Sequence, residues 1–216
     1  MNIVILGPQG SGKDTQTEML AEKFSLERVN MGNFLREVAK MPTPLGREIY
    51  HYQNDLGAMV PSRILKEVLG MKVMSYPREQ SIIFEGVPRT MDQAEYFDEV
   101  VLESGRHIDS VIYINISEAE TIRRISKRWM CSKCKKIIIK GVDIRDEKEK
   151  CPDCAGEVIQ RIDDTPEVIR KRLKVFRDET IPVLEYYREQ GKLIEVNGEQ
   201  SIEKVFADIL KELSEI

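Results

Sequence analysis

Histidine is scarce in this sequence, and several features that define large protein classes are missing. The chain of 216 residues contains 2 histidines, which leaves little room for chemistry built on imidazole groups. No apolar run approaches the ~20 residues that a membrane-spanning helix needs. The first residues, MNIVILG, lack the basic start and the apolar length of a secretory signal. We therefore expect a cytoplasmic protein in a reducing compartment, with no membrane partner.

An excess of positive charge is also missing. The 33 Lys and Arg residues are outnumbered by 37 Asp and Glu residues, and the formal net charge is -4. Proteins that wrap nucleic acid depend on bulk positive charge, so this balance argues against a nucleic-acid partner. Hydrophobic residues make up 41% of the chain, which suffices for a well-buried core.

Cysteine occurs only four times, in two C-x2-C pairs. The pairs are Cys131/Cys134 and Cys151/Cys154, with sixteen residues between them. This spacing is typical of a four-thiolate zinc site. Four thiolates complete a tetrahedron and leave no position for water, so the metal would be structural. Iron, two disulfides and four unrelated thiols are the alternatives, although disulfides are rare in a reducing compartment.

Short β-branched runs alternate with longer segments of helical period. The expected strands are residues 2–6, 27–30, 81–84, 110–116 and 192–196. The expected helices are residues 14–24, 62–74, 92–104, 118–129, 166–190 and 202–214. Ser117 and Glu120 have the spacing of a capping box, and Thr165-Pro166 offers an N-cap followed by proline. This alternation predicts an α/β fold with a parallel sheet, interrupted by insertions near residues 131–160 and 31–60.

A glycine-rich loop follows the first expected strand and precedes the first expected helix. Its sequence is GPQGSGK, residues 7–13. Glycines let backbone N–H groups converge on an anion, and a helix N-terminus adds partial positive charge. Lys13 would reach the β- and γ-phosphates of a nucleotide. Asp14 occupies the position where the general motif has Ser or Thr, and Thr15 comes next; a simple strand–helix turn with a surface lysine is the alternative.

Arginines suited to phosphate binding are scattered along the rest of the chain. They are Arg36, Arg89, Arg124, Arg128, Arg161 and Arg172. Arg124 and Arg128 are four residues apart on one expected helix, so we predict that they share a face, with Ile122, Ile125 and Trp129 on a core face. The alternative for any one of these arginines is an ordinary surface charge in contact with solvent, which is the commoner case.

Taken together, these segments resemble the adenylate kinase family, in its bacterial form with a zinc-bearing lid. The resemblance runs over essentially the whole chain. Its segments, in family order, are residues 7–15, GNFLR (32–36), EGVPRT (85–90) with Gln93, RISKR (124–128), the two cysteine pairs, RIDD (161–164), RKR (170–172) and NGEQ (197–200).

The resemblance implies a fold, a reaction and cofactors. The fold would be a P-loop NTPase-like, five-stranded parallel sheet flanked by helices, with a core formed by residues 1–29, 61–126 and 165–216. Residues 30–60 would form a mobile AMP-binding domain, and residues 127–164 a mobile zinc-binding lid. The reaction would be magnesium-dependent and reversible, with ATP and AMP giving two ADP. The implied cofactors are Mg²⁺ with ATP and structural Zn²⁺, and the implied state is a monomer.

The resemblance also implies roles for individual residues. The ATP-binding set is Gly10, Ser11, Gly12, Lys13, Asp14, Thr15, Arg124, Arg128, Ile137, Ile138 and Gln200. The AMP-binding set is Met31, Arg36, Ala58, Met59, Val60, Gly86, Arg89, Gln93, Arg161 and Arg172. The catalytic set is Lys13, Arg89, Arg124, Arg161 and Arg172. Glu85 would orient magnesium-bound water, and Asp163 and Asp164 would help to close the lid.

The chain departs from the family pattern at several of these positions, including Ile137 and Ile138, where relatives carry a hydroxyl and an aromatic residue near ATP. Asp14 replaces Gly, Met31 replaces Thr or Ser near the AMP base, and Glu85 replaces Asp. A thioether cannot donate a hydrogen bond, so the acceptor base could differ from that of AMP. The alternatives are therefore a kinase for CMP, UMP or dAMP and a weakly catalytic nucleotide-binding regulator. A nucleic-acid-binding zinc ribbon is a further alternative, but no aromatic residue lies between the first and last cysteine to stack on bases.

Overall fold

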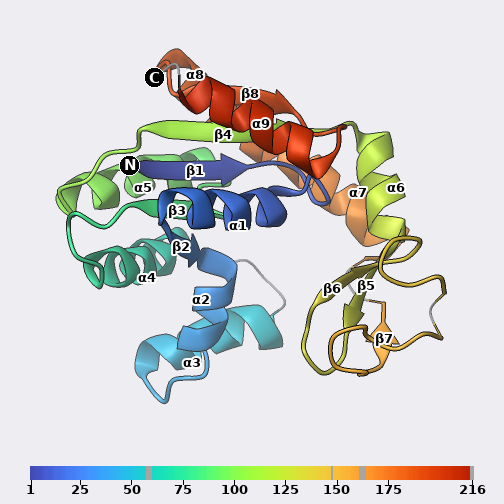
Figure 1. Ribbon diagram of the computed structural model, residues 1–216. Helices are drawn as coiled ribbons and strands as arrows, with labels where there is room; N and C mark the ends of the chain where they lie inside the picture. The colour runs from blue at the N-terminus through green and yellow to red at the C-terminus, as the bar shows by residue number, and fades with distance from the viewer. Residues whose placement is uncertain (57–59, 147, 161–163, 215–216) are drawn as a thin grey trace.

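Five parallel strands form the central sheet of the protein. The computed structural model describes residues 1–56, 60–146, 148–160 and 164–214 (Figure 1). Within these residues the strand order is β2-β3-β1-β4-β8. The strands are β1 (Asn2–Leu6), β2 (Glu27–Asn30), β3 (Ile82–Glu85), β4 (Ser110–Asn115) and β8 (Leu193–Asn197). All five predicted strands are confirmed to within one residue at each end, and the α/β fold class is confirmed with them.

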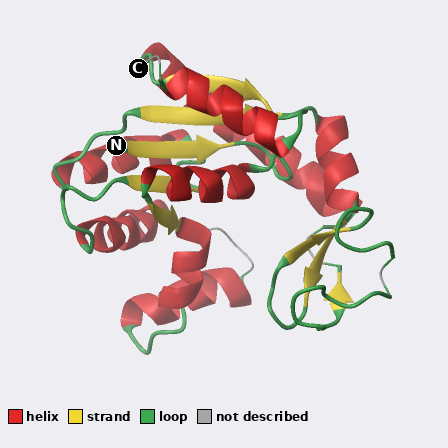
Figure 2. Cartoon of the chain, in the orientation of Figure 1, coloured by secondary structure: helices red, strands yellow, loops and turns green. Residues whose placement is uncertain are grey.

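Helices cover both faces of this sheet (Figure 2), which explains why the inner strands β3, β1 and β4 are almost completely buried. On β1, Ile3 and Ile5 belong to the core cluster on one face, whereas Val4 and Leu6 belong to the cluster on the other. This two-sided burial is typical of parallel sheets. The first face is covered by α1 (Lys13–Phe24) and α9 (Ile202–Leu213), and the second by α4 (Ser62–Met74), α5 (Met91–Glu103) and α8 (Ile181–Glu189). In the part of the chain that the structure describes, no helix is long and apolar enough to cross a bilayer.

A helical arm follows β2 and extends beyond the sheet (Figure 1). It contains α2 (Met31–Val38), α3 (Pro44–Tyr50) and the π-helical turn η1 (His51–Asp55). Asn30 caps α2 by accepting a 2.9 Å hydrogen bond from the backbone N–H of Asn33. Thr43 caps α3 in the same way, with Pro44 in the first turn. The arm coincides with the insertion expected near residues 31–60.

A second, antiparallel sheet forms the other insertion. It contains β5 (Arg128–Cys131), β6 (Ile137–Ile139) and β7 (Val158–Ile159), in the order β6-β5-β7. It follows α6 (Glu118–Ser126), which is shorter than predicted. The prediction of one helix to residue 129 was wrong, because Trp129 pairs with Ile138 in the antiparallel sheet. Ile125 is buried as predicted, but Ile122 is 41% exposed, so its assignment to the core was also wrong.

The long helix predicted over residues 166–190 is divided into three parts. These are α7 (Pro166–Val175), the π-helical turn η2 (Phe176–Thr180) and α8. Thr165 caps α7 as predicted, its hydroxyl accepting a hydrogen bond from the N–H of Val168. Pro182 lies in the first turn of α8, where its missing N–H is tolerated. The widened turn therefore absorbs a proline that would otherwise break the helix.

Candidate active site

The glycine-rich loop between β1 and α1 has the geometry of an anion cradle. Gly10 and Gly12 have φ angles of 81° and 90°, a left-handed conformation that favours glycine. Gly12 is the N-cap of α1 and supplies no capping side chain, so the first amides of the helix keep their capacity to bind an anion. The Ser11 hydroxyl is buried and has no hydrogen-bond partner among the described residues.

Two carboxylates lie beside the lysine that ends this loop. Lys13 Nζ is 3.8 Å from Asp14 Oδ1, and Glu85 lies at the end of the neighbouring strand β3. Burial, followed by the negative charge of Asp14, raises the pKa of Glu85 to about 7. Although the Asp14 side chain is 71% exposed, partial desolvation by the surrounding chain acts to raise its pKa; the charge of Lys13 and a hydrogen bond from Glu85 outweigh this, and the pKa is lowered. The pair therefore shares one proton near neutral pH, and Asp14 carries the negative charge.

The same carboxylates are the groups at this loop that suit a hard divalent cation. Glu85 Oε2 is buried and accepts no hydrogen bond from the described residues, and Arg28 Nη2 lies 3.7 Å from it. Mg²⁺ prefers carboxylate oxygen and retained water as ligands. The residues present thus fit a hydrated Mg²⁺ beside the phosphate loop.

Two arginines of the predicted acceptor side are held near one another. The side chain of Gln93 accepts a 2.8 Å hydrogen bond from the backbone N–H of Arg89, and the hydroxyl of Thr180 donates to the Arg89 carbonyl at 3.0 Å. Arg89 Nε donates to the Gly86 carbonyl at 2.9 Å. Burial and then the positive charge of Arg172 lower the pKa of Arg89. Like charges brought together in this way are typical of a site for a polyanion.

The helical arm places the remaining described residues of the predicted AMP set. Met31 begins α2 and is 2% exposed, and Val60 is also buried. Arg36 is exposed and donates to the side chain of Asn33. Val60 and Gln93 line a cleft of ≈ 430 Å³ at the starts of α4 and α5. Ala58 and Met59 lie outside the described residues.

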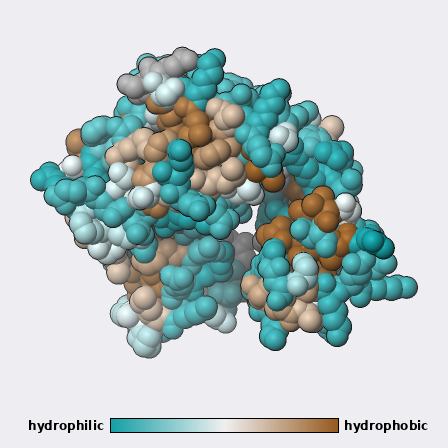
Figure 3. Space-filling model, in the orientation of Figure 1, coloured by the Kyte–Doolittle hydropathy of each residue, from teal (hydrophilic) through white to brown (hydrophobic). Residues whose placement is uncertain are grey.

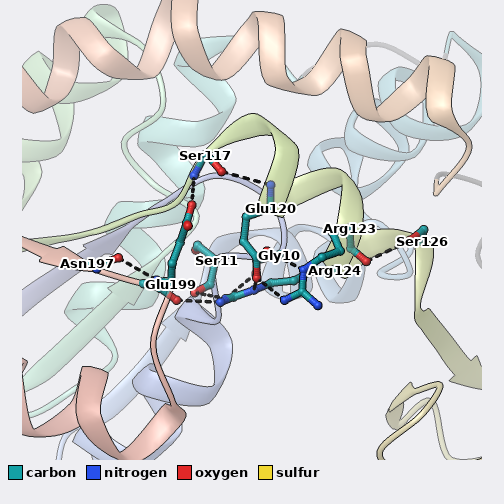
Figure 4. Close-up of polar contacts among 10 residues, drawn as sticks. Gly10, Ser11, Ser117, Glu120, Arg123, Arg124, Ser126, Asn197 and Glu199 are labelled. Atoms are coloured by element: carbon teal, nitrogen blue, oxygen red, sulfur yellow. Dashed lines mark hydrogen bonds and ion pairs between the residues drawn. The ribbon is translucent and has the colours of Figure 1, made fainter.

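Arg124 joins the phosphate loop to the β8–α9 connection, which contains Gln200. Arg124 Nη2 donates to the Gly198 carbonyl at 2.7 Å, and Nη1 donates to the Gly10 carbonyl at 3.3 Å (Figure 4). Gln200 Nε2 donates to the Asn197 carbonyl at 2.9 Å. A second cleft of ≈ 370 Å³ lies at the carboxyl ends of β4 and β8.

The base of the lid segment (residues 127–164) is tied to the phosphate loop. Arg128 makes a two-point ion pair with Asp164, Nε to Oδ2 at 2.9 Å and Nη2 to Oδ1 at 2.5 Å. Gln9 Nε2 also donates to Asp164 Oδ1, at 3.1 Å, and the Asp164 side chain is fully buried. The prediction that Arg124 and Arg128 share a helical face was wrong, because α6 ends before Arg128.

Gln9 was not among the predicted site residues, and its partner Asp164 is 155 residues away in the sequence. Its position in the glycine-rich loop was visible, but no local signal indicates this contact. Arg161 and Asp163, which the resemblance also implicates, lie outside the described residues.

The four cysteine sulfurs are gathered in the lid segment. All four Sγ atoms lie within 4.8 Å of one another; Cys131–Cys154 is 3.4 Å and Cys134–Cys151 is 3.7 Å. A tetrahedral metal with bonds of about 2.3 Å requires edges of about 3.8 Å. A Cβ on Gly156 would lie 2.7 Å from Cys131 Sγ, so the chain around the sulfurs leaves no room for a side chain there. The cluster, which contains no disulfide, is compatible with zinc.

The two isoleucines of the predicted ATP set differ in exposure. Ile138 is fully buried in the apolar cluster of the lid segment, whereas Ile137 is 38% exposed.

These groups converge on one side of the molecule. The phosphate loop, Glu85, and the β4–α6 and β8–α9 connections all follow carboxyl ends of parallel strands, where α/β sheets bind ligands. Figure 3 shows a hollow between the core, the helical arm and the lid segment, with hydrophilic side chains on the core side and a mixture of hydrophobic and hydrophilic side chains on the lid side. The arrangement can hold a polyphosphate at the sheet edge, with a separate insertion on either side.

Comparison with known proteins agrees with this geometry. The sequence model of the adenylate kinase family matches residues 5–192. An adenylate kinase of Dehalococcoides mccartyi is 39% identical over 214 residues, which cover 97% of this chain and 96% of that protein. The adenylate kinase of Methanothrix thermoacetophila is 38% identical over 99% of both chains, and that of Archaeoglobus fulgidus is 35% identical over 97% of this chain and 96% of its own. The phosphate cradle, the converging arginines and these full-length similarities together show that the chain belongs to the adenylate kinase family.

Proposed function

We propose that the protein catalyses the reversible transfer of the γ-phosphoryl group of Mg-ATP to AMP, giving two ADP. The observation that carries this proposal is the phosphate cradle at one sheet edge, with Lys13 and Glu85 beside it and Arg89 and Arg172 brought together nearby. Phosphoryl transfer requires alignment and charge stabilisation more than covalent help from the protein. These groups supply both.

In this proposal, Lys13 and the loop amides hold the ATP phosphates, while Arg89 and Arg172 neutralise the AMP phosphate and the transferring group. Burial lowers the pKa of Lys13, so its ammonium is poorly solvated and gains strongly from a phosphate partner. Arginine at a transferring phosphoryl group is worth about 10³-fold or more in rate. Arg161 is assigned to the same group by resemblance alone.

Magnesium would arrive with ATP and neutralise charge on its phosphates. Glu85 would accept hydrogen bonds from the water molecules of the ion through its buried oxygen. Glu85 must be ionised for this role, and its pKa of about 7 makes its ionisation sensitive to pH near neutrality.

The acceptor base would lie against Met31, Val60 and Gln93, at the junction of the helical arm with the core. Gln93 uses its carbonyl oxygen on the Arg89 backbone, so its amide N–H₂ is the group that faces an acceptor base. Met31 supports a purine through apolar contact but offers no hydrogen bond. AMP is the favoured acceptor, and CMP or UMP is the second candidate because of this methionine.

We further propose that the four cysteines bind Zn²⁺ and that the two insertions close over the substrates. A segment as small as the lid cannot build a sufficient core of its own, so a metal held by four thiolates would stabilise its fold. Closure would exclude water and protect ATP from hydrolysis. On the strength of the family resemblance, we take the protein to act as a cytoplasmic monomer.

A coupled assay of ADP formation tests the proposal. Mg-ATP is supplied with AMP, dAMP, CMP, UMP or GMP, for the wild type, Lys13→Ala and the matched control Lys23→Ala, which removes a lysine from the far end of α1. We expect AMP to be preferred and Lys13→Ala to lower turnover by about 10²- to 10³-fold, with the control unchanged. Preference for another base would show that AMP is not the preferred acceptor. No ADP from a folded, metal-loaded sample would overturn the proposal and favour the regulatory alternative.

A further inference from the structure

The N-terminus of α6 departs from the capping box that its sequence predicts. The Ser117 hydroxyl accepts a 3.2 Å hydrogen bond from the N–H of Glu120, as expected. In a complete box, the carboxylate of Glu120 would bind the N–H of Ser117 in return. That N–H instead donates to Glu199 Oε1, 2.7 Å away, from a loop 82 residues further along the chain. Glu199 thus takes over the capping contact and leaves the Glu120 carboxylate available.

The Glu120 carboxylate instead binds two arginines on its own helix (Figure 4). Its Oε1 accepts from Arg124 Nε and Arg123 Nη2, and its Oε2 accepts from Arg123 Nε, all at 2.6 Å. The hydrogen bond from Arg123 outweighs a desolvation effect and, together with Arg124, lowers the pKa of Glu120 to about 2. The Glu120 side chain is only 13% exposed, so this is a shielded anion rather than a solvated surface charge.

The Arg124 guanidinium is held along its polar edges by three separate segments. Nε is bound by Glu120, Nη1 by the Gly10 carbonyl of the phosphate loop and Nη2 by the Gly198 carbonyl after β8. Phosphate binding requires those same edges, whereas a nucleobase stacks on the flat face of a guanidinium. The side chain is 26% exposed, so part of Arg124 remains accessible to a ligand, and the hydrogen bond to the Gly10 carbonyl places its guanidinium beside the phosphate loop.

We propose that Glu120 is a positioning residue for donor-nucleotide binding: it fixes the orientation of Arg124, the residue that the family resemblance places against the base of ATP. Glu199 makes this possible by replacing Glu120 as the cap of α6. The inference rests on the proposed function, because it assumes that ATP occupies the phosphate loop. It assigns Glu120 an effect on ATP binding and none on the acceptor or on the transfer step.

Steady-state kinetics of the full-length protein test this assignment. For Glu120→Ala we expect KM for ATP to rise about tenfold, the value of one charge-assisted hydrogen bond, with kcat and KM for AMP within about twofold of wild type. Glu120→Gln keeps one acceptor oxygen and should give an intermediate KM. Arg123→Ala removes the other partner of Glu120 and is the matched control, with KM for ATP unchanged. A helix-surface ion pair without a binding role would leave all these values unchanged and would overturn the proposal.

Two further variants test the mechanism. In an Arg124→Ala background, Glu120→Ala should add no further increase in KM for ATP, because Glu120 acts through Arg124; additive effects would contradict this. Glu199→Ala leaves the N–H of Ser117 free to recapture Glu120, so KM for ATP should rise as it does in Glu120→Ala. An unchanged KM in Glu199→Ala would refute the exchange of caps.

Calorimetric titration with ATP alone separates failure of this inference from failure of the proposed function. If the protein forms no ADP but binds ATP, the same order of dissociation constants among the variants is expected. If Arg124→Ala weakens ATP binding and Glu120→Ala does not, the positioning role fails while the proposed function stands. If Arg124→Ala has no effect on ATP binding, then Arg124 does not contact the base of ATP and the proposal fails. Thermal unfolding of each variant confirms that the comparison concerns folded protein.

Discussion

Because Asp14 and Glu85 share a proton, we expect the free energy of unfolding to depend on pH. A single substitution, Asp14→Asn, should make this pH dependence weaker. The pKa of Glu85 is about 7, against 4.5 for an ordinary glutamate, first because of burial and then because of the charge of Asp14. Between these pH values the unfolded chain ionises the carboxyl while the folded protein keeps it protonated. The folded state therefore binds the extra proton, and the free energy of unfolding falls as the pH rises through this window. A difference of about 2.5 pKa units corresponds to about 3 kcal/mol.

Asp14→Asn removes the neighbouring charge but leaves the burial of Glu85 unchanged. Asp14 is 71% exposed, so solvent screens its charge, and we expect the pKa of Glu85 to fall by about one unit rather than to its ordinary value. The fall in stability between pH 5 and 8 should shrink by about 1.4 kcal/mol. Asp14 itself titrates below its usual 3.8 and so does not contribute within this range.

Urea unfolding at pH 5 and 8 measures the effect in the wild type, Asp14→Asn and Glu85→Gln. Glu22→Gln, an exposed acid on the same helix, is the matched control and should keep the wild-type pH dependence. The acid limb of the kcat/KM profile should move to lower pH in Asp14→Asn, since Glu85 must be ionised to act on magnesium-bound water. The reasoning is refuted if the wild type and Asp14→Asn lose equal stability between pH 5 and 8, or if Glu85 titrates near 4.5 in the wild type.

Three further results follow from the site and the lid segment. Gly156→Ala should lower the bound zinc below one ion per chain, measured by atomic emission, because its Cβ would lie 2.7 Å from Cys131 Sγ; stoichiometric zinc with an unchanged melting temperature would contradict the assigned geometry. Removing the metal from the wild type with a chelator should lower the melting temperature by calorimetry, and an identical thermogram would count against a structural metal. Met31→Thr restores a hydroxyl at the acceptor base and should raise discrimination for AMP over CMP about 5- to 10-fold in kcat/KM; an unchanged ratio would place Met31 away from the base.

The core of this fold could be predicted from local pattern because its inner strands are apolar on both faces and several of its helices begin at a capping side chain. The lid segment could not. Ile122, Ile125 and Trp129 have helical spacing, but Trp129 pairs with Ile138 in an antiparallel strand. The helix ends where this non-local pairing begins, and no local propensity encodes that competition. The π-helical turn before Pro182 was missed for a different reason, since apolar periodicity continues through it while the hydrogen-bond pattern changes.

In the candidate site, too, the local motifs could be predicted from the sequence, whereas the long-range contacts could not. The phosphate loop and the cysteine pairs are contiguous in sequence, so their geometry was predictable from spacing. The contacts of Gln9 with Asp164 and of Glu199 with Ser117 join residues 155 and 82 positions apart. In the second case only one of the two hydrogen bonds of the predicted capping box forms. The other is lost because the distant carboxylate of Glu199 accepts the N–H of Ser117. Such competition is decided by tertiary packing and leaves no mark in a local motif.

The parallel sheet also determines where the two ends of the described chain lie, and therefore where a tether or a fusion partner can be joined. Met1 precedes β1, so the start of the chain lies at the amino edge of the sheet, away from the phosphate loop. Helix α9 follows β8 and runs back along the sheet, so that it ends on the same side of the molecule as the start of β1 (Figure 1). Both ends of the described chain therefore point away from the hollow where nucleotides would bind. A surface tether, fluorescent fusion or force-spectroscopy handle joined at either end would therefore lie away from both insertions.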